Sequence, residues 1–128
     1  MARVKILVAD DDETIRALLT RLFVRRGESV EAAVDGAAAI ACLETAAYDL
    51  LILDLMMPRT DGLGVLAYLR NRAVPSPAVI VITAAVPSLA ASVPKDQVAA
   101  VVTKPFEITS LIQIAADAVN GQGARAEG

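Results

Sequence analysis

The sequence Leu50-Leu51-Ile52-Leu53-Asp54 is apolar at four consecutive positions and then ends in a carboxylate. A half-exposed strand alternates apolar and polar side chains, whereas this segment has no polar face before Asp54. It therefore predicts a strand that is covered on both faces, as at the centre of a parallel sheet. A carboxylate placed directly after such a strand is costly to bury without a partner, so Asp54 is the first candidate functional residue.

Strands and helices are expected to alternate around this segment. Further strands are predicted at residues 4–9, 30–34 and 78–82 and from residue 101, and helices between residues 13 and 27, at 37–45, at 63–72 and at 108–119. Residues 86–100 contain Pro87 and Pro94, so any fourth helix there should be short or displaced. Five such alternations predict an α/β fold with parallel strands and helices on both faces of the sheet.

Charge and residue content exclude several classes of function. The net charge of −3 argues against a nucleic-acid-binding domain, which usually carries a basic surplus. A single cysteine, Cys42, rules out a disulfide within the chain. Because the chain has no histidine, a Cys/His zinc site and a histidine-based nucleophilic triad are also excluded.

The length of 128 residues fits one domain, expected at residues 1–120. The Gly/Ala-rich segment 121–128 is predicted to be a flexible tail. The apolar runs are far shorter than the ~20 residues of a membrane helix, and the N-terminus lacks a secretory pattern. We therefore expect no membrane association and a cytoplasmic location.

Polar residues follow the predicted strands where each of them ends. These residues are Asp10, Asp11, Asp54, Thr83 and Lys104. Since active sites of open parallel sheets lie at the carboxyl ends of the strands, we expect the five to converge. Three crowded carboxylates attract a hard cation, Mg²⁺ or Mn²⁺. Lysine and a hydroxyl suit a phosphoryl group, and an aspartate can accept one, so placement alone predicts phosphoryl transfer to or from a carboxylate.

Each residue also has a purely structural interpretation. An acidic pair after a strand is often only a helix N-cap, the role that we assign to Asp12. Thr83 could simply end a strand, and Lys104 could be a solvated surface residue. Five polar residues predicted at one edge of the sheet favour a functional site over coincidence.

Four motifs resemble those of the receiver domains of two-component response regulators. They are Asp10-Asp11-Asp12, residues 49–58 together with Asp61-Gly62, Ile82-Thr83-Ala84, and Lys104-Pro105-Phe106. The resemblance extends from residue 4 to about residue 119. It implies a flavodoxin-like sheet of strand order 2-1-3-4-5 and marks Asp54 as the phosphoacceptor.

The resemblance also implies roles for the other residues of the site. Asp11, Asp54 and the backbone carbonyl of Met56 would bind Mg²⁺ directly, and Asp10 would act largely through water. Thr83 and Lys104 would contact the phosphoryl group. The Lys104–Pro105 peptide bond is expected to be cis, because X-Pro bonds are the place where cis is cheap.

Partners follow from the same resemblance. The phosphodonor would be a phosphohistidine on a sensor histidine kinase or a histidine phosphotransfer protein, since this chain has no histidine. No effector domain follows the motifs, so we expect a stand-alone receiver that is not an enzyme and acts on an unknown downstream protein. A monomer or a weak dimer is expected.

The sequence departs from the family pattern at the switch position, and two alternative functions stay open. Val101 occupies the switch position of the fifth strand, where the family usually has Tyr or Phe. The first alternative is a degenerate receiver that acts as a phosphorylation-independent binding module. The second is a Mg²⁺-dependent phosphatase with an aspartate nucleophile, although such enzymes usually carry a second aspartate where Met56 stands.

Overall fold

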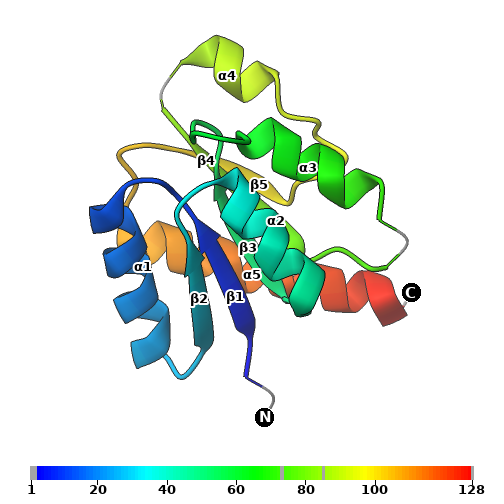
Figure 1. Ribbon diagram of the computed structural model, residues 1–128. Helices are drawn as coiled ribbons and strands as arrows, with labels where there is room; N and C mark the ends of the chain where they lie inside the picture. Colours follow the sequence, from blue (N-terminus) through cyan, green and yellow to red (C-terminus); the bar gives the residue numbers. More distant parts are fainter. Residues whose placement is uncertain (1–2, 73, 85, 128) are drawn as a thin grey trace.

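The chain forms a five-stranded parallel sheet flanked by helices (Figure 1). The computed structural model describes residues 3–72, 74–84 and 86–127, with side chains as far as residue 121. The strand order is β2-β1-β3-β4-β5, as the resemblance implied. The strands are β1 (Lys5–Ala9), β2 (Ser29–Ala33), β3 (Leu50–Asp54), β4 (Ala78–Thr83) and β5 (Ala100–Thr103). The helices are α1 (Glu13–Arg25), α2 (Gly36–Thr45), α3 (Gly62–Arg70), α4 (Pro87–Ala91) and α5 (Ile108–Glu127).

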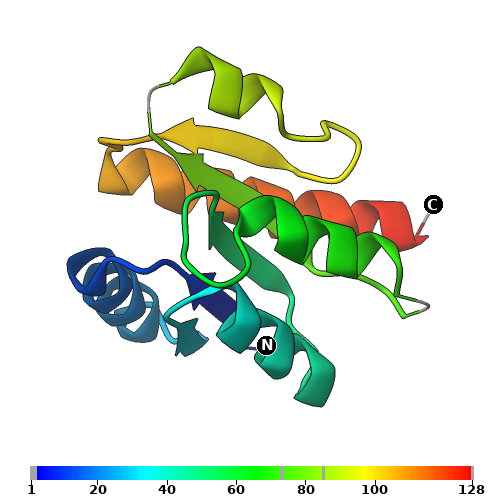
Figure 2. The ribbon, with the colours of Figure 1, turned by 45° about the horizontal axis from the view of Figure 1, so that its top comes forward.

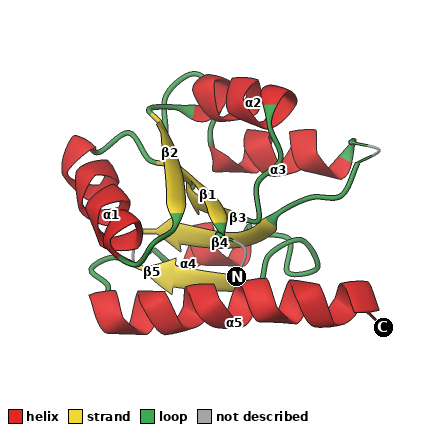
Figure 3. Ribbon diagram, turned by 90° about the horizontal axis from the view of Figure 1, so that it is seen from below, coloured by secondary structure: helices red, strands yellow, loops and turns green. Residues whose placement is uncertain are grey.

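Two apolar layers cover the sheet, one on each face. Helices α1 and α5 lie on one face, and α2 and α3 lie on the other (Figures 2 and 3). In β3, Leu51 and Leu53 pack toward α2 and α3, whereas Leu50 and Ile52 pack toward α1 and α5. All five residues of β3 are buried. The continuous apolar pattern therefore predicted the doubly covered central strand correctly.

Helix ends follow from local chemistry. The Asp12 carboxylate accepts a hydrogen bond from the Thr14 N–H at 2.8 Å and caps α1, as predicted. Gly27, just beyond the end of α1, has φ +88°, a conformation that glycine adopts at little cost. Helix α4 has only five residues and no side-chain cap, which confirms the short helix expected between the two prolines.

The predicted bounds of several elements are off by one or two residues, and the largest differences concern β2 and the end of the last helix. Val34 was predicted to end β2 but lies outside it. Because β2 is an edge strand, most of its residues are partly or fully exposed, and Ala33 is the buried one. The last helix does not end near residue 119 but continues to Glu127. Residues 121–127 are rich in Ala, Gln, Arg and Glu, whose helix propensity offsets the cost of the two glycines.

Among the helices of the described ranges, none combines the length and the apolar character required to cross a bilayer.

Candidate functional site

The carboxyl ends of four strands bring the predicted polar residues to one edge of the sheet. Asp54 is the last residue of β3 and Thr83 the last of β4, while Asp10 follows β1 and Lys104 follows β5. Asp10, Asp54 and Thr83 are buried, with exposed fractions of 2%, 5% and 0%. Three neighbouring strands thus deliver polar groups that are withdrawn from water.

Three carboxylates meet at this edge. One oxygen from each of Asp10, Asp11 and Asp54 lies within 4.8 Å of the other two. Asp10 and Asp11 can share the site because the chain leaves the strand after Ala9. The Asp12 N–H donates to Asp10 Oδ1 at 2.9 Å, and Arg16 Nη1 donates to the Asp10 carbonyl at 2.8 Å. These two contacts fix the turn that presents Asp10 and Asp11 together.

Lys104 supplies the positive charge of the site. Its Nζ lies 3.3 Å from Asp10 Oδ2 and 3.6 Å from Asp54 Oδ2. Burial by itself would lower the pKa of this ammonium group, but the carboxylates of Asp10 and Asp54 outweigh burial and raise its pKa. The Lys104–Pro105 bond, on the carboxyl side of this residue, is cis, as expected. Lys104 is therefore held as a cation against two acidic groups.

The pKa of Asp54 is raised from 3.8 to about 6. Burial is the main cause and the charge of Asp10 is the second, while the Met56 N–H and Lys104 act in the opposite direction. The Met56 N–H donates to Asp54 Oδ1 at 3.2 Å. One lysine is thus not enough to neutralise the carboxylates, and the site has an affinity for further positive charge.

Two buried oxygens lack hydrogen bonds within the described part of the chain. They are Thr83 Oγ1 and Asp10 Oδ2, the second of which faces Lys104 without hydrogen-bond geometry. Buried polar atoms of native proteins are nearly always satisfied, so such atoms point to an ion, water or ligand. An all-oxygen set with two withdrawn carboxylates and one exposed carboxylate suits Mg²⁺, which keeps several waters of its own. The residues present therefore fit a hard divalent cation.

The structure adds a group that the sequence did not single out. The segment 55–61, which we call the β3–α3 loop, contacts the start of α2, where Asp35 pairs with Arg59. Asp35 directly follows the predicted strand 30–34, but the sequence pattern gave neither it nor Arg59 a functional role. Nothing in the pattern links these residues, because they are 24 positions apart.

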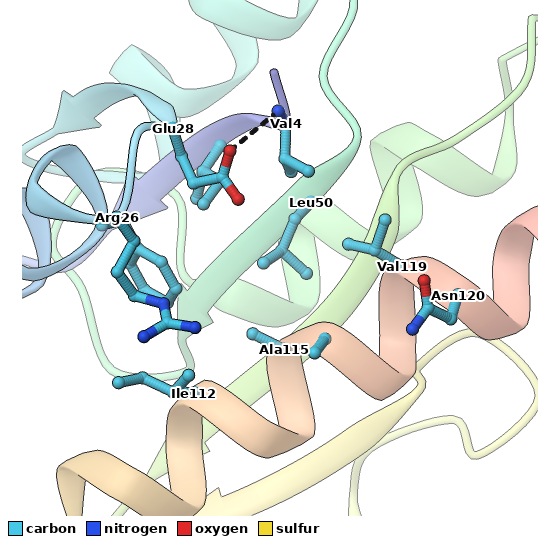
Figure 4. Close-up of a pocket in the computed structure, with 11 residues that line it drawn as sticks. Val4, Arg26, Glu28, Leu50, Ile112, Ala115, Val119 and Asn120 are labelled. Carbon is cyan, nitrogen blue, oxygen red and sulfur yellow. Dashed lines mark hydrogen bonds between the residues drawn. The ribbon is translucent and has the colours of Figure 1, made fainter. Parts of the chain in front are cut away.

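A separate cavity of about 200 Å³ lies at the opposite end of the sheet (Figure 4). It is bordered by Val4 and Leu50 at the amino ends of β1 and β3 and by Ala115 and Val119 of α5. At its rim Glu28 accepts a hydrogen bond from the Val4 N–H at 3.1 Å. Its lining is mainly apolar and contains none of the five predicted site residues. This cavity and the predicted functional residues therefore lie at opposite ends of the sheet.

A family model for the response regulator receiver domain matches residues 6–116 of the 128. The chain belongs to this family. The receiver domain is 40% identical over 81 residues to the transcriptional regulatory protein TcrA of Mycobacterium tuberculosis, a match that covers 63% of this chain and 32% of that protein. It is 47% identical over 68 residues to the response regulator MprA of Mycobacterium bovis, covering 53% and 30%. The chain spans about a third of the length of these curated relatives.

Solved structures agree with this assignment. The receiver domain of the Francisella response regulator 1452 superimposes with a TM-score of 0.84 at 30% identity, covering 94% of this chain and 99% of that one. NtrX from Brucella abortus gives 0.89 at 27% identity, covering 98% and 29%. TrrA from Thermotoga maritima, solved in complex with Mg²⁺-BeF, gives 0.79 at 28% identity, covering 90% and 98%. The receiver domain of this chain is thus a response-regulator signalling domain with a flavodoxin-like fold.

The raised pKa of Asp54 predicts an unusual dependence of stability on pH. Its carboxyl pKa is about 6 in the folded receiver domain and 3.8 in the unfolded chain, so the folded state binds more protons between these values. Without metal, the contribution of Asp54 to the free energy of unfolding should therefore fall by about 1–3 kcal/mol as pH rises from about 4 to 6 and stay low above it. Urea unfolding in EDTA at several pH values measures this.

The variant Asp54→Asn is the control for this dependence. It should lose that part of the pH dependence and exceed the wild type in stability at pH 7.5 by a similar amount. If the wild type instead becomes more stable from pH 4 to 6 relative to this variant, the Asp54 carboxylate is stabilised by its surroundings and the argument is wrong.

Proposed function

We propose that this receiver domain accepts a phosphoryl group on Asp54. The observation that carries the proposal is the pairing of a buried carboxylate with two phosphate-binding groups. Lys104 Nζ lies 3.6 Å from Asp54 Oδ2, and the Thr83 hydroxyl is buried at the end of the adjacent strand without a hydrogen-bond partner in the described chain. A phosphoryl group on Asp54 would give the Thr83 hydroxyl a hydrogen-bond partner and Lys104 a further anionic one.

Asp10, Asp11, Asp54 and the backbone carbonyl of Met56 are the groups that would hold Mg²⁺. The carboxylate cluster and the unsatisfied Asp10 Oδ2 support this, and so does the Mg²⁺-BeF complex of TrrA. When bound, the metal neutralises negative charge that develops on the phosphoryl oxygens.

The transfer itself requires a nucleophile and stabilisation of charge. An Asp54 oxygen forms a bond to phosphorus while the phosphorus–nitrogen bond of a phosphohistidine breaks, and the imidazole leaves with that electron pair. Lys104 and the Thr83 hydroxyl donate to the equatorial oxygens, where negative charge accumulates. Burial of Asp54 keeps bulk water from competing, since only 5% of the residue is exposed.

The donor in this proposal is a sensor histidine kinase or a histidine phosphotransfer protein, and the output is a changed affinity for a downstream protein. Val101 pairs in register with Val81 and packs with the apolar cluster on the α2/α3 side. An aromatic side chain that rotates inward is therefore not available at this position to transmit the change, and we assign that role to the five-residue α4. The domain is a signalling switch rather than an enzyme with a separate substrate, because the only reactions that it promotes are its own phosphorylation and dephosphorylation.

The two alternatives receive less support. A phosphorylation-independent binding module has no need for buried, unsatisfied Thr83 and Asp10 oxygens, which cost stability. An aspartate-nucleophile phosphatase would need an acid two positions after Asp54, where the exposed side chain of Met56 stands.

Removal of the metal provides a direct test. Incubation with acetyl phosphate and Mg²⁺ should add one phosphoryl group per chain in the intact mass spectrum, and EDTA should reduce the rate at least tenfold because the carboxylate charge is then uncompensated. Restoring Mg²⁺ should restore the rate. An adduct that forms equally fast in EDTA would exclude a metal-dependent site, and no adduct under any condition would exclude the proposed function.

A further inference from the structure

The ion pair between Arg59 and Asp35 joins the β3–α3 loop to the start of α2. Arg59 Nε donates to Asp35 Oδ2 at 2.7 Å. The Asp35 side chain is only 5% exposed, whereas that of Arg59 is 73% exposed. Asp35 Oδ1 accepts from the Ala38 N–H at 2.8 Å, so both carboxylate oxygens are occupied. The Ala38 N–H and then Arg59 lower the pKa of Asp35, which keeps this carboxylate charged.

The backbone of Arg59 indicates that its side chain has a specific task. Arg59 has φ +61°, and it is the one non-glycine residue with positive φ in the described chain. Glycine or asparagine adopts this conformation more readily than arginine, for which it costs about 1 kcal/mol. A residue that only had to complete the turn would not need to be an arginine, whereas the contact with Asp35 requires a long cationic side chain.

The loop is also confined by backbone contacts at both of its ends. A Cβ on Gly36 would lie 1.8 Å from the Thr60 carbonyl oxygen, so the loop lies directly on the first turn of α2. A Cβ on Gly62 would lie 2.6 Å from the Asp54 carbonyl oxygen. The Gly62 N–H donates to the Leu55 carbonyl at 3.0 Å, which closes the loop on itself. The residues between these points, Met56 included, have little freedom while both contacts hold.

Met56 connects this loop to the carboxylate site. Its N–H donates to Asp54 Oδ1 at 3.2 Å, so the position of the Met56 backbone and the orientation of the Asp54 side chain depend on each other. Its side chain is exposed and cannot anchor the segment by burial. Leu55 and Met57, on either side of it, are buried in the apolar cluster on the α2/α3 side, and the Arg59–Asp35 pair is the loop's one side-chain ion pair to another element among the described residues.

We propose that Arg59 and Asp35 are positioning residues that hold the Met56 backbone in the geometry required for metal binding at Asp54. The inference rests on the proposed function, which assigns the Met56 carbonyl to the metal. Neither side chain touches the metal. They act by limiting the loop to one conformation, so that the carbonyl does not have to be ordered when the cation binds.

The variant Arg59→Asn tests this, because asparagine tolerates positive φ but cannot reach Asp35 with a cation. Mg²⁺ affinity of the unphosphorylated protein is measured by calorimetric titration, and stability by urea unfolding in EDTA. We expect the dissociation constant for Mg²⁺ to rise about tenfold, as for other residues that support metal ligands, with little change in the unfolding midpoint. Arg70→Gln is the matched control: it breaks the exposed Arg70–Asp96 pair on α3 and should leave Mg²⁺ affinity unchanged.

A second variant and a kinetic readout separate positioning from general loosening. Asp35→Asn keeps the cap on Ala38 but loses the charge that Arg59 contacts, so it should weaken Mg²⁺ binding by a similar factor, and the double variant should be no worse than either single one. In Arg59→Asn, phosphorylation by acetyl phosphate should need about tenfold more Mg²⁺ for half its maximal rate, while the rate at saturating Mg²⁺ stays close to that of the wild type.

The outcomes distinguish this inference from the function on which it rests. Wild-type Mg²⁺ affinity in Arg59→Asn would overturn the positioning role, as would additive effects in the double variant or a fall in stability that accounts for the whole change. If the wild type itself binds no Mg²⁺ or takes no phosphoryl group, the proposed function fails instead.

Discussion

The variant Asp54→Asn should form no phosphoryl adduct with acetyl phosphate and Mg²⁺, whereas the wild type acquires one. The amide is not a nucleophile toward phosphorus, and no other carboxylate among the described side chains has the same surroundings. Lys104 Nζ lies within 4 Å of only Asp10 and Asp54 among the described acids, and Asp10 is held through Oδ1 by the Asp12 N–H. We expect at least a hundredfold loss in the initial rate, measured by intact mass, which corresponds to about 3 kcal/mol or more.

A matched control lies at the opposite end of the same strand. Asp49 precedes β3, and its carboxylate accepts a hydrogen bond from the Lys5 N–H at 2.8 Å, which an asparagine oxygen can also accept. Asp49→Asn removes the same charge and should form the adduct at the wild-type rate. An undiminished adduct on Asp54→Asn would show that another residue is the acceptor. Equal loss in both variants would show an effect of net charge alone.

The variant Gly36→Ala should destabilise the protein by about 2–4 kcal/mol. The added Cβ would lie 1.8 Å from the Thr60 carbonyl oxygen and 2.5 Å from its carbon, so either α2 or the β3–α3 loop must move. Both contacts are to backbone atoms, which cannot rotate away as a flexible side chain can. Such overpacking typically costs 1–3 kcal/mol and sometimes more. Urea unfolding in EDTA measures the effect.

Gly121→Ala is the control for this substitution. A Cβ there meets nothing within 4 Å, and the residue lies within α5, so the change should be neutral or stabilising by up to about 1 kcal/mol. We also expect Gly36→Ala to weaken Mg²⁺ binding, since the displaced loop carries Met56. Unchanged stability in Gly36→Ala would mean that the loop does not rest on α2 in solution, and the confinement of Met56 would then lose its basis.

The predicted fold was confirmed where the sequence carried a strong local pattern. Continuous apolar runs predicted the buried strands β3 and β4, and the aspartate at position 12 predicted the cap of α1. Prediction was weakest where local signals compete, as at the edge strand β2 and at the end of α5. There the apolar periodicity stops near Val119, while helix propensity continues the helix to Glu127.

For the candidate site too, part of the arrangement could be predicted from the sequence and part could not. Since parallel strands all end at one edge, the rule for open sheets anticipated that Asp10, Asp54, Thr83 and Lys104 would meet. That rule could not show that Lys104 lies nearer to Asp10 than to Asp54, or that Thr83 Oγ1 is left without a hydrogen bond. These depend on side-chain placement across four strands.

By itself, the sequence specified the parallel sheet and the chemistry at its edge, because burial periodicity and the direction of parallel strands are local properties repeated along the chain. The Arg59–Asp35 pair, the contact of Thr60 with Gly36 and the raised pKa of Asp54 arose only from the tertiary structure. Each depends on distances between segments far apart in the chain and on exclusion of water, which exist only once the helices have packed on the sheet.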